Sequence, residues 1–171
     1  MEKKIVFDCD NTFGMKGCDV DDGLTLLYLL GHPRADLLGV TTTYGNSRTE
    51  AVYPNTLKMA REIGREGLTV KRGGGSPGDY KSEAVDFLVE MADRHQGELS
   101  VLATGSLTNL GGAYEKDPHF FEKVKEIVLM GGITEPLLFA KGRMDELNFT
   151  CDRKATFSVL TKGRNVSVIT G

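Results

Sequence analysis

The chain has 171 residues and a formal net charge of −3, with 40% hydrophobic and 26% charged residues. This length predicts one domain with a sizeable core, and the weak negative charge excludes a general attraction to nucleic acid or anionic membranes. No apolar run is long enough for a membrane span, and the N-terminus lacks a secretory signal, so we expect a cytoplasmic protein. The three cysteines, Cys9, Cys18 and Cys151, include no C-x-x-C pair, which is typical of free thiols in a reducing compartment.

Short β-rich runs alternate with helical stretches along the chain. The predicted strands cover residues 3–9, 36–44, 68–73, 98–104, 125–132 and 165–171. The predicted helices cover residues 21–31, 47–64, 82–95, 106–116, 118–124 and 151–163. Continuous apolar strands separated by helices predict an α/β fold with a mostly parallel β-sheet and helices on both faces.

Acidic residues are concentrated near the N-terminus, where five aspartates occur within fifteen residues: Asp8, Asp10, Asp19, Asp21 and Asp22. Asp8 and Asp10 end the first predicted strand, and ligands of parallel sheets bind beyond the carboxyl ends of the strands. Capping of the first helix accounts for one carboxylate, but so many like charges repel unless a cation lies among them. Carboxylate oxygens suit a divalent cation such as calcium, which acidifies a bound water.

The first strand end also resembles a phosphatase motif. Asp8-Cys9-Asp10-Asn11-Thr12 reads as D-x-D-x-T, which is similar to the first motif of the haloacid dehalogenase-like phosphatases. In that interpretation Asp8 is the nucleophile and Asp10 is an acid/base. The later lysine and acidic motifs of those enzymes have no convincing counterpart here, and a short motif is not specific by itself.

A broader resemblance covers essentially the whole chain. In order, it comprises DCD…DVDDG (8–23), LLGVTTTYGN (37–46), VLATGSLTNL (101–110), KEIVLMGG (125–132) and DELNFTCD (145–152). Together these segments resemble the inosine–uridine preferring nucleoside hydrolases. The resemblance implies a Rossmann-like core and a Ca²⁺-bound water that hydrolyses the N-glycosidic bond of ribonucleosides to ribose and free base. It also implies a small-molecule ribonucleoside as partner, neither nucleic acid nor membrane, and a homo-oligomer.

The resemblance assigns roles to individual residues. Asp10 and Asp22 are expected to bind the metal with their carboxylates, and Thr104 with its backbone carbonyl. Asp10 is also expected to be catalytic, because it is placed to take a proton from the bound water. The residues expected to bind the substrate's ribose are Asp21, Asn46, Glu146 and Asn148.

Two departures from the family pattern qualify these expectations. The segment NTFGMKGC (11–18) is inserted between the two aspartate pairs, and we expect it to form an excursion beside the site. Family members continue through a further segment that carries another metal-binding Asp and usually a His near the leaving base. We therefore expect residues 1–171 to form a single nucleoside hydrolase-like domain, truncated at the C-terminus and impaired in activity. The alternative is a catalytically inactive binding or assembly module that uses an exposed sheet edge.

A glycine-rich stretch, KRGGGSPGDYKSE (71–83), lacks the G-x-x-x-x-G-K-[ST] pattern of a phosphate-binding loop. We predict a flexible turn before the helix over 82–95, without an assigned role in substrate binding.

Overall fold

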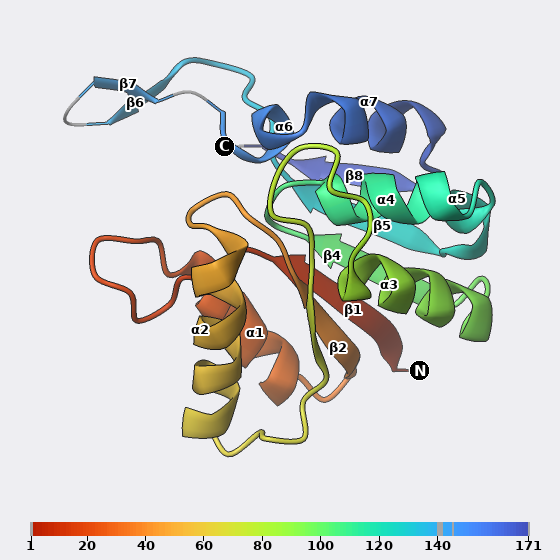
Figure 1. The fold of residues 1–171 in the computed structure, drawn as a ribbon, viewed down its shortest axis with the longest axis horizontal. Helices are drawn as coiled ribbons and strands as arrows, with labels where there is room; N and C mark the ends of the chain where they lie inside the picture. Colours follow the sequence, from red (N-terminus) through yellow and green to blue (C-terminus); the bar gives the residue numbers. More distant parts are fainter. Residues whose placement is uncertain (1, 140–141, 145, 171) are drawn as a thin grey trace.

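The computed structural model describes residues 2–139, 142–144 and 146–170. A six-stranded parallel sheet with the order β3-β2-β1-β4-β5-β8 forms its centre (Figure 1). Its strands are β1 (Lys3–Cys9), β2 (Ala35–Thr42), β3 (Val70–Arg72), β4 (Leu99–Ala103), β5 (Glu126–Met130) and β8 (Val166–Ile169). A separate antiparallel hairpin consists of β6 (Leu137–Phe139) and β7 (Gly142–Met144).

Helices cover both faces of the sheet, as predicted. The described helices are α1 (Asp21–Gly31), α2 (Thr49–Glu62), α3 (Glu83–Arg94), α4 (Thr108–Lys116), α5 (Phe120–Lys123), α6 (Asn148–Cys151) and α7 (Arg153–Lys162). Figure 1 shows α1 and α2 on one side of the sheet, and α3, α4, α5 and α7 on the other. The chain therefore forms the α/β architecture expected from its alternating strands and helices.

The core consists of two apolar clusters, one on each face of the sheet. Adjacent residues of β1 belong to different clusters, because successive side chains of a strand point to opposite faces. Val6 packs with residues of the α3 and α4 layer, such as Leu88 and Leu110. Phe7 packs with residues of the α1 and α2 layer, such as Leu26 and Met59. Burial of β1 on both faces fixes the direction in which its carboxyl end points.

The strand order creates a topological switch point at the centre of the sheet. From β1 the chain builds β2 and β3 on one side, then crosses to form β4, β5 and β8 on the other. The connections leaving β1 and β4 thus diverge, which opens a crevice at the carboxyl ends of these two strands. Asp10 follows β1 and Thr104 follows β4, so both residues lie at this crevice.

Most predicted elements are confirmed, with small differences at their ends. The first strand and the helix over 21–31 have the predicted bounds, and Ser82 caps α3 by accepting a hydrogen bond from Val85 N at 3.3 Å. The strand predicted over 36–44 already ends at Thr42, because residues 43–46 turn toward Asp10. The hairpin of β6 and β7 and the four-residue helix α6 were missed, since they lack a long periodic pattern. Gly171, in the last predicted strand, lies outside the described residues.

Within the described ranges, no helix combines the length and apolar character that crossing a bilayer requires.

The inserted segment 11–18 is fixed onto α1 by a close contact at Gly23. A Cβ atom at Gly23 would lie only 2.2 Å from Phe13 Cβ, whereas a Cβ atom at Gly31 of the same helix would meet nothing within 4 Å. We predict that Gly23→Ala lowers the free energy of unfolding by about 1–3 kcal/mol, the usual cost of overpacking. Gly31→Ala is the control, and we expect it to be neutral or stabilising. Urea unfolding of both variants measures the difference, and equal stabilities would contradict this packing.

Candidate functional site

Asp8 is fully buried at the end of β1 and is held by two neighbouring elements. Its Oδ1 accepts hydrogen bonds from Thr41 Oγ1 of β2 at 2.5 Å and from Asn109 Nδ2 of α4 at 2.7 Å. The same Asn109 amide donates to the Thr42 carbonyl at 3.0 Å. Asp8 Oδ2 is buried without a hydrogen-bond partner. Asp8 thereby joins β1, β2 and α4 beneath the crevice.

The predicted metal ligands are connected to one another. Asp22, in the first turn of α1, accepts a hydrogen bond from the Asp10 backbone N at 2.9 Å through Oδ2. Its Oδ1 accepts one from Thr104 Oγ1 at 2.5 Å. Both carboxylates are buried: Asp10 is 0% and Asp22 3% exposed. The structure thus brings Asp10, Asp22 and Thr104 together from three separate elements.

Two glycines allow the backbone to approach the Asp10 carboxylate. A Cβ atom at Gly45 would lie 2.2 Å from Asp10 Oδ2, and one at Gly105 would lie 3.0 Å from Asp10 Oδ1. Next to Gly45, the Asn46 backbone N donates a hydrogen bond to Asp10 Oδ2. The carboxylate is therefore oriented by the turn after β2, and its other oxygen, Oδ1, is buried without a partner.

The two predicted ribose-binding residues near the C-terminal end of the site differ in their surroundings. Asn148 Nδ2 donates to the Thr104 and Met130 carbonyls, both at 2.9 Å, so Asn148 lies at the ends of β4 and β5. Glu146 instead receives backbone hydrogen bonds from Gly132, Phe149 and Thr150 at 3.0–3.1 Å. Its carboxylate thus stabilises the turn that begins α6.

The site has an excess of buried negative charge. Burial raises the pKa of Asp8 to about 7, although the hydrogen bonds from Thr41 and Asn109 act in the opposite direction. Burial also raises the pKa of Asp10 and, together with the nearby charge of Asp10, raises that of Asp22 well above its usual range. These shifts report the unfavourable desolvation of carboxylates without a counter-charge.

A divalent cation would supply this counter-charge. Among the residues that the structure describes, three carboxylate oxygens are buried without a hydrogen-bond partner: Asp8 Oδ2, Asp10 Oδ1 and Asp21 Oδ1. Hard divalent cations prefer such oxygen donors. In the same part of the chain, no three His, Cys, Asp or Glu side chains form a metal-ligand group. The predicted ligand set contains two carboxylates and one carbonyl, so its chemistry fits a hard cation with positions left for water or substrate.

The inserted segment 11–18 packs against α2. Asn55 Nδ2 of α2 donates to the carbonyls of Asn11 and Phe13 at 3.2 and 3.1 Å. Thr12 Oγ1 donates to the Asp19 carbonyl at 2.9 Å, which closes the segment onto itself. The insertion therefore extends away from the aspartate pairs and returns the chain to Asp21 and Asp22.

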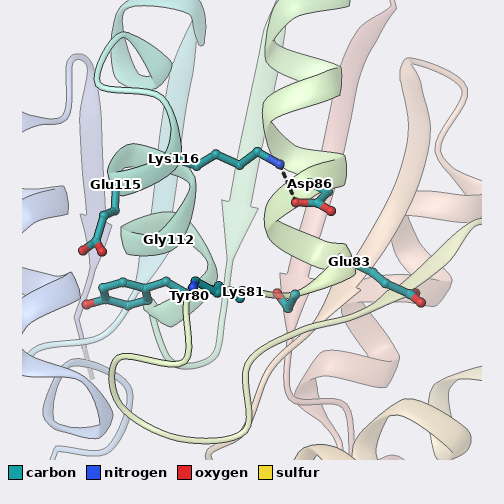
Figure 2. Close-up of a pocket in the computed structure, with 8 residues that line it drawn as sticks. Tyr80, Lys81, Glu83, Asp86, Gly112, Glu115 and Lys116 are labelled. Carbon is teal, nitrogen blue, oxygen red and sulfur yellow. Dashed lines mark hydrogen bonds and ion pairs between the residues drawn. The ribbon is translucent and has the colours of Figure 1, made fainter.

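A separate cleft of about 600 Å³ lies between α3 and α4 (Figure 2). Its described lining residues are Tyr80, Lys81, Ser82, Glu83, Asp86, Gly112, Glu115 and Lys116, none of which belongs to the predicted site. Figure 2 shows Lys116 reaching Asp86, with which it forms an ion pair at 2.6 Å. The charged side chains that line the cleft are both acidic and basic, so they do not favour a ligand of either charge. We therefore assign the chemistry to the strand ends, where the buried carboxylates lie.

Almost the whole chain matches one known protein family. The family model for the inosine-uridine preferring nucleoside hydrolase matches residues 5–171. The chain belongs to this family. Its relatives include a probable uridine nucleosidase 1 of Oryza sativa subsp. japonica, 30% identical over 88% of this chain and 55% of the relative.

Solved nucleoside hydrolase structures share the fold. A plant nucleoside hydrolase superposes with a TM-score of 0.85 at 26% identity, covering 99% of this chain and 60% of that one. A purine-preferring ribonucleoside hydrolase from Gardnerella vaginalis gives a TM-score of 0.82 at 26% identity, covering 98% and 60%. The chain spans about half the length of the curated relatives it matches. A family match over nearly the whole chain decides against the phosphatase interpretation of Asp8 and Asp10.

Several supporting residues were not predicted from the sequence. Thr41 and Asn109 hold Asp8, and Asp152 accepts hydrogen bonds from Gly78 N and Thr108 Oγ1. Asn109 lies within the TGSLTN segment that carries part of the family resemblance, so the motif contained its signal. Asp152 ends the DELNFTCD segment of the same resemblance and also gives a helix-cap signal before α7, but its further contacts depend on the tertiary fold.

The raised pKa of Asp8 makes the stability of the metal-free protein depend on pH. Between the unfolded value of 3.8 and the folded value of about 7, the folded state binds more protons than the unfolded state. The free energy of unfolding therefore falls as pH rises through this range. Asp8→Asn retains the acceptor for Thr41 and Asn109, so we predict that it flattens this pH dependence.

Urea unfolding in chelator at pH 5 and pH 8 tests this prediction. The stability difference between the two pH values should be smaller in Asp8→Asn than in the wild type, by on the order of 3 kcal/mol. Parallel pH profiles would show that Asp8 does not titrate in this range.

Proposed function

We propose that this chain binds Ca²⁺ and a ribonucleoside at the carboxyl ends of β1 and β4, and that it catalyses hydrolysis of the N-glycosidic bond to ribose and free base. One observation carries the proposal: Asp10, Asp22 and Thr104 are joined by hydrogen bonds, and Asp10 Oδ1 beside them is buried without a partner. The membership of the chain in the nucleoside hydrolase family supports this reading.

The cation would be held by the carboxylates of Asp10 and Asp22 and by the Thr104 carbonyl. When bound, Ca²⁺ lowers the pKa of a coordinated water and so makes that water a better nucleophile. Asn148 supports this arrangement, because its amide donates to the Thr104 carbonyl and limits the directions in which that carbonyl points. A carbonyl oxygen has a second lone pair available for the cation.

Asp10 is the proposed general base. Its Oδ2 is held by the Asn46 N–H, and its Oδ1, which has no partner among the described residues, has lone pairs both for the cation and for the proton of the bound water. The water oxygen forms a bond to the anomeric carbon as its proton passes to Asp10, and the bond from that carbon to the base nitrogen breaks. The departing nucleobase takes up a proton from solvent, and Asp10 returns its proton to solvent, which balances the reaction. A positioned general base contributes about 10²–10⁴-fold to a rate.

Ribose would be bound by side chains around the same crevice. Asp21 has a buried, unpartnered Oδ1 that can accept a hydrogen bond from a sugar hydroxyl. Asn46, in the turn after β2, and Asn148, in α6, are the further proposed ligands of the sugar. Glu146, whose oxygens already accept backbone hydrogen bonds, would act at the edge of the sugar site.

Substitutions at the two aspartates test the metal site and the catalytic role of Asp10. We predict that Asp10→Asn lowers ribose release from inosine or uridine at least about 100-fold, since the side chain that accepts the proton of the water is lost. Asp22→Ala should weaken Ca²⁺ binding measured by calorimetry, because affinity follows the number of charged ligands. Asp19→Asn is the control, since Asp19 is an exposed carboxylate of the same segment.

The wild-type result distinguishes the enzyme from the binding module. Ribose release that depends on Ca²⁺ and on Asp10 supports the proposal. Ca²⁺ binding at Asp22 without ribose release would favour the binding module, and equal behaviour of Asp22→Ala and Asp19→Asn would contradict a metal site at Asp22.

We further propose a homo-oligomer in a reducing, cytoplasmic compartment. The edge strand β8 and the neighbouring α7 expose apolar side chains, among them Ile169 at 61% and Phe157 at 67%. A second copy of the chain that covers this edge would remove them from water. Free thiols at Cys9, Cys18 and Cys151 suit the compartment. Light scattering should give at least a dimer mass, and a monomer mass at micromolar concentration would contradict the assembly.

A further inference from the structure

One buried carboxylate outside the predicted site connects three segments of the chain. Asp152 is 2% exposed and lies at the junction of α6 and α7. Its Oδ1 accepts the Ala155 N–H at 3.0 Å, which caps α7. Its Oδ2 accepts the Gly78 N–H at 2.9 Å and the Thr108 hydroxyl at 3.0 Å. A cap needs only the first of these contacts, so the other two call for a different explanation.

The contacts of Asp152 lead to Tyr44 by two routes. Thr108 Oγ1 lies 3.3 Å from the Tyr44 hydroxyl, and because its one proton goes to Asp152, it meets Tyr44 as a packing contact. The Tyr44 hydroxyl donates a 2.8 Å hydrogen bond to the carbonyl of Cys151, the residue next to Asp152. The Tyr44 ring is thereby fixed at its polar end by groups that Asp152 holds in place.

Tyr44 belongs to the turn that orients Asp10. The next two residues of this turn adjoin the Asp10 carboxylate: Gly45 leaves room for Asp10 Oδ2, and the Asn46 N–H donates to that oxygen. Thr43, on the other side of Tyr44, is tied to Ser106 by a hydroxyl–hydroxyl hydrogen bond of 2.6 Å. Displacing Tyr44 would therefore move the donor that sets the direction of the Asp10 carboxylate.

We propose that Asp152 is a positioning residue for Asp10. It holds Tyr44, through Thr108 and the Cys151 carbonyl, so that the turn of residues 43–46 presents the Asn46 N–H to Asp10. Asp152 Oδ2 also accepts the Gly78 N–H. This hydrogen bond stabilises the glycine-rich loop from Gly73 to Tyr80 beside α4. Three hydrogen bonds from separate segments converge on this one buried carboxylate, so it is well suited to fix a turn. The catalytic consequence rests on the proposed function.

Thr108 offers a matched pair of variants. Thr108→Val keeps the shape and removes the hydroxyl, whereas Thr108→Ser keeps the hydroxyl. We expect Thr108→Val to speed hydrogen exchange of the Asn46 amide about tenfold by NMR, because the turn opens locally. It should also lower kcat/KM for inosine about tenfold, since a small displacement of the Asp10 carboxylate slows the reaction. In Thr108→Ser, Asn46 exchange and kcat/KM should both stay within about twofold of the wild type.

A second set of variants connects the effect to Asp152 itself. Asp152→Asn keeps an oxygen to cap α7 but exchanges the other acceptor for a donor. Its effect on hydrogen exchange of the Asn46 amide should not add to that of Tyr44→Phe, because both variants break the same connection between Asp152 and Tyr44. Ser82→Ala removes the cap of α3 outside this network, and it should lower stability without changing Asn46 exchange or kcat/KM.

The two readouts keep this proposal distinct from the proposed function. If the wild type releases no ribose, the proposed function fails, while the exchange of the Asn46 amide still tests the role of Asp152. The positioning role is overturned if Thr108→Val and Asp152→Asn leave Asn46 exchange unchanged, or if both effects also appear in Ser82→Ala.

Discussion

Buried negative charge at the end of β1 is the constraint on which the rest of the site depends. Asp8, Asp10 and Asp22 are almost completely removed from water, and burial raises the pKa of each. Moving carboxylates away from water is unfavourable unless hydrogen bonds or a cation compensate. Asp8 Oδ1 accepts hydrogen bonds from Thr41 and Asn109, whereas Asp8 Oδ2 and Asp10 Oδ1 have no partner among the described residues. The site is therefore best explained as one that is completed by a cation.

The parallel sheet makes this arrangement possible. Burial of β1 on both faces, by Val6 on one and Phe7 on the other, holds its carboxyl end in place. The switch in strand order leaves space between the connections that follow β1 and β4. Glycines at positions 45 and 105 then let the backbone close around Asp10. Apolar packing thus determines where the charged groups meet, and small residues determine how closely they are enclosed.

The sequence predicted the fold and allowed the candidate site residues to be proposed, because both rest on local patterns. Alternation of apolar strands and helices is visible in the sequence, where Asp8 and Thr104 lie at the ends of predicted strands and Asp10 follows one directly. The supporting contacts were not predictable in this way. The connection of Asp152 to Gly78 spans 74 positions, and that of Asn109 to Asp8 spans 101. Such pairs are determined by how helices pack on the sheet, which no spacing in the sequence reveals.

The central claim is a cation site at Asp10, Asp22 and Thr104. A structure from crystals grown with calcium tests it most directly. The account predicts one ion at about 2.3–2.6 Å from a carboxylate oxygen of Asp10, one of Asp22 and the Thr104 carbonyl, the usual range for calcium–oxygen contacts. An ion bound elsewhere, or none at these oxygens at saturating calcium, would contradict it.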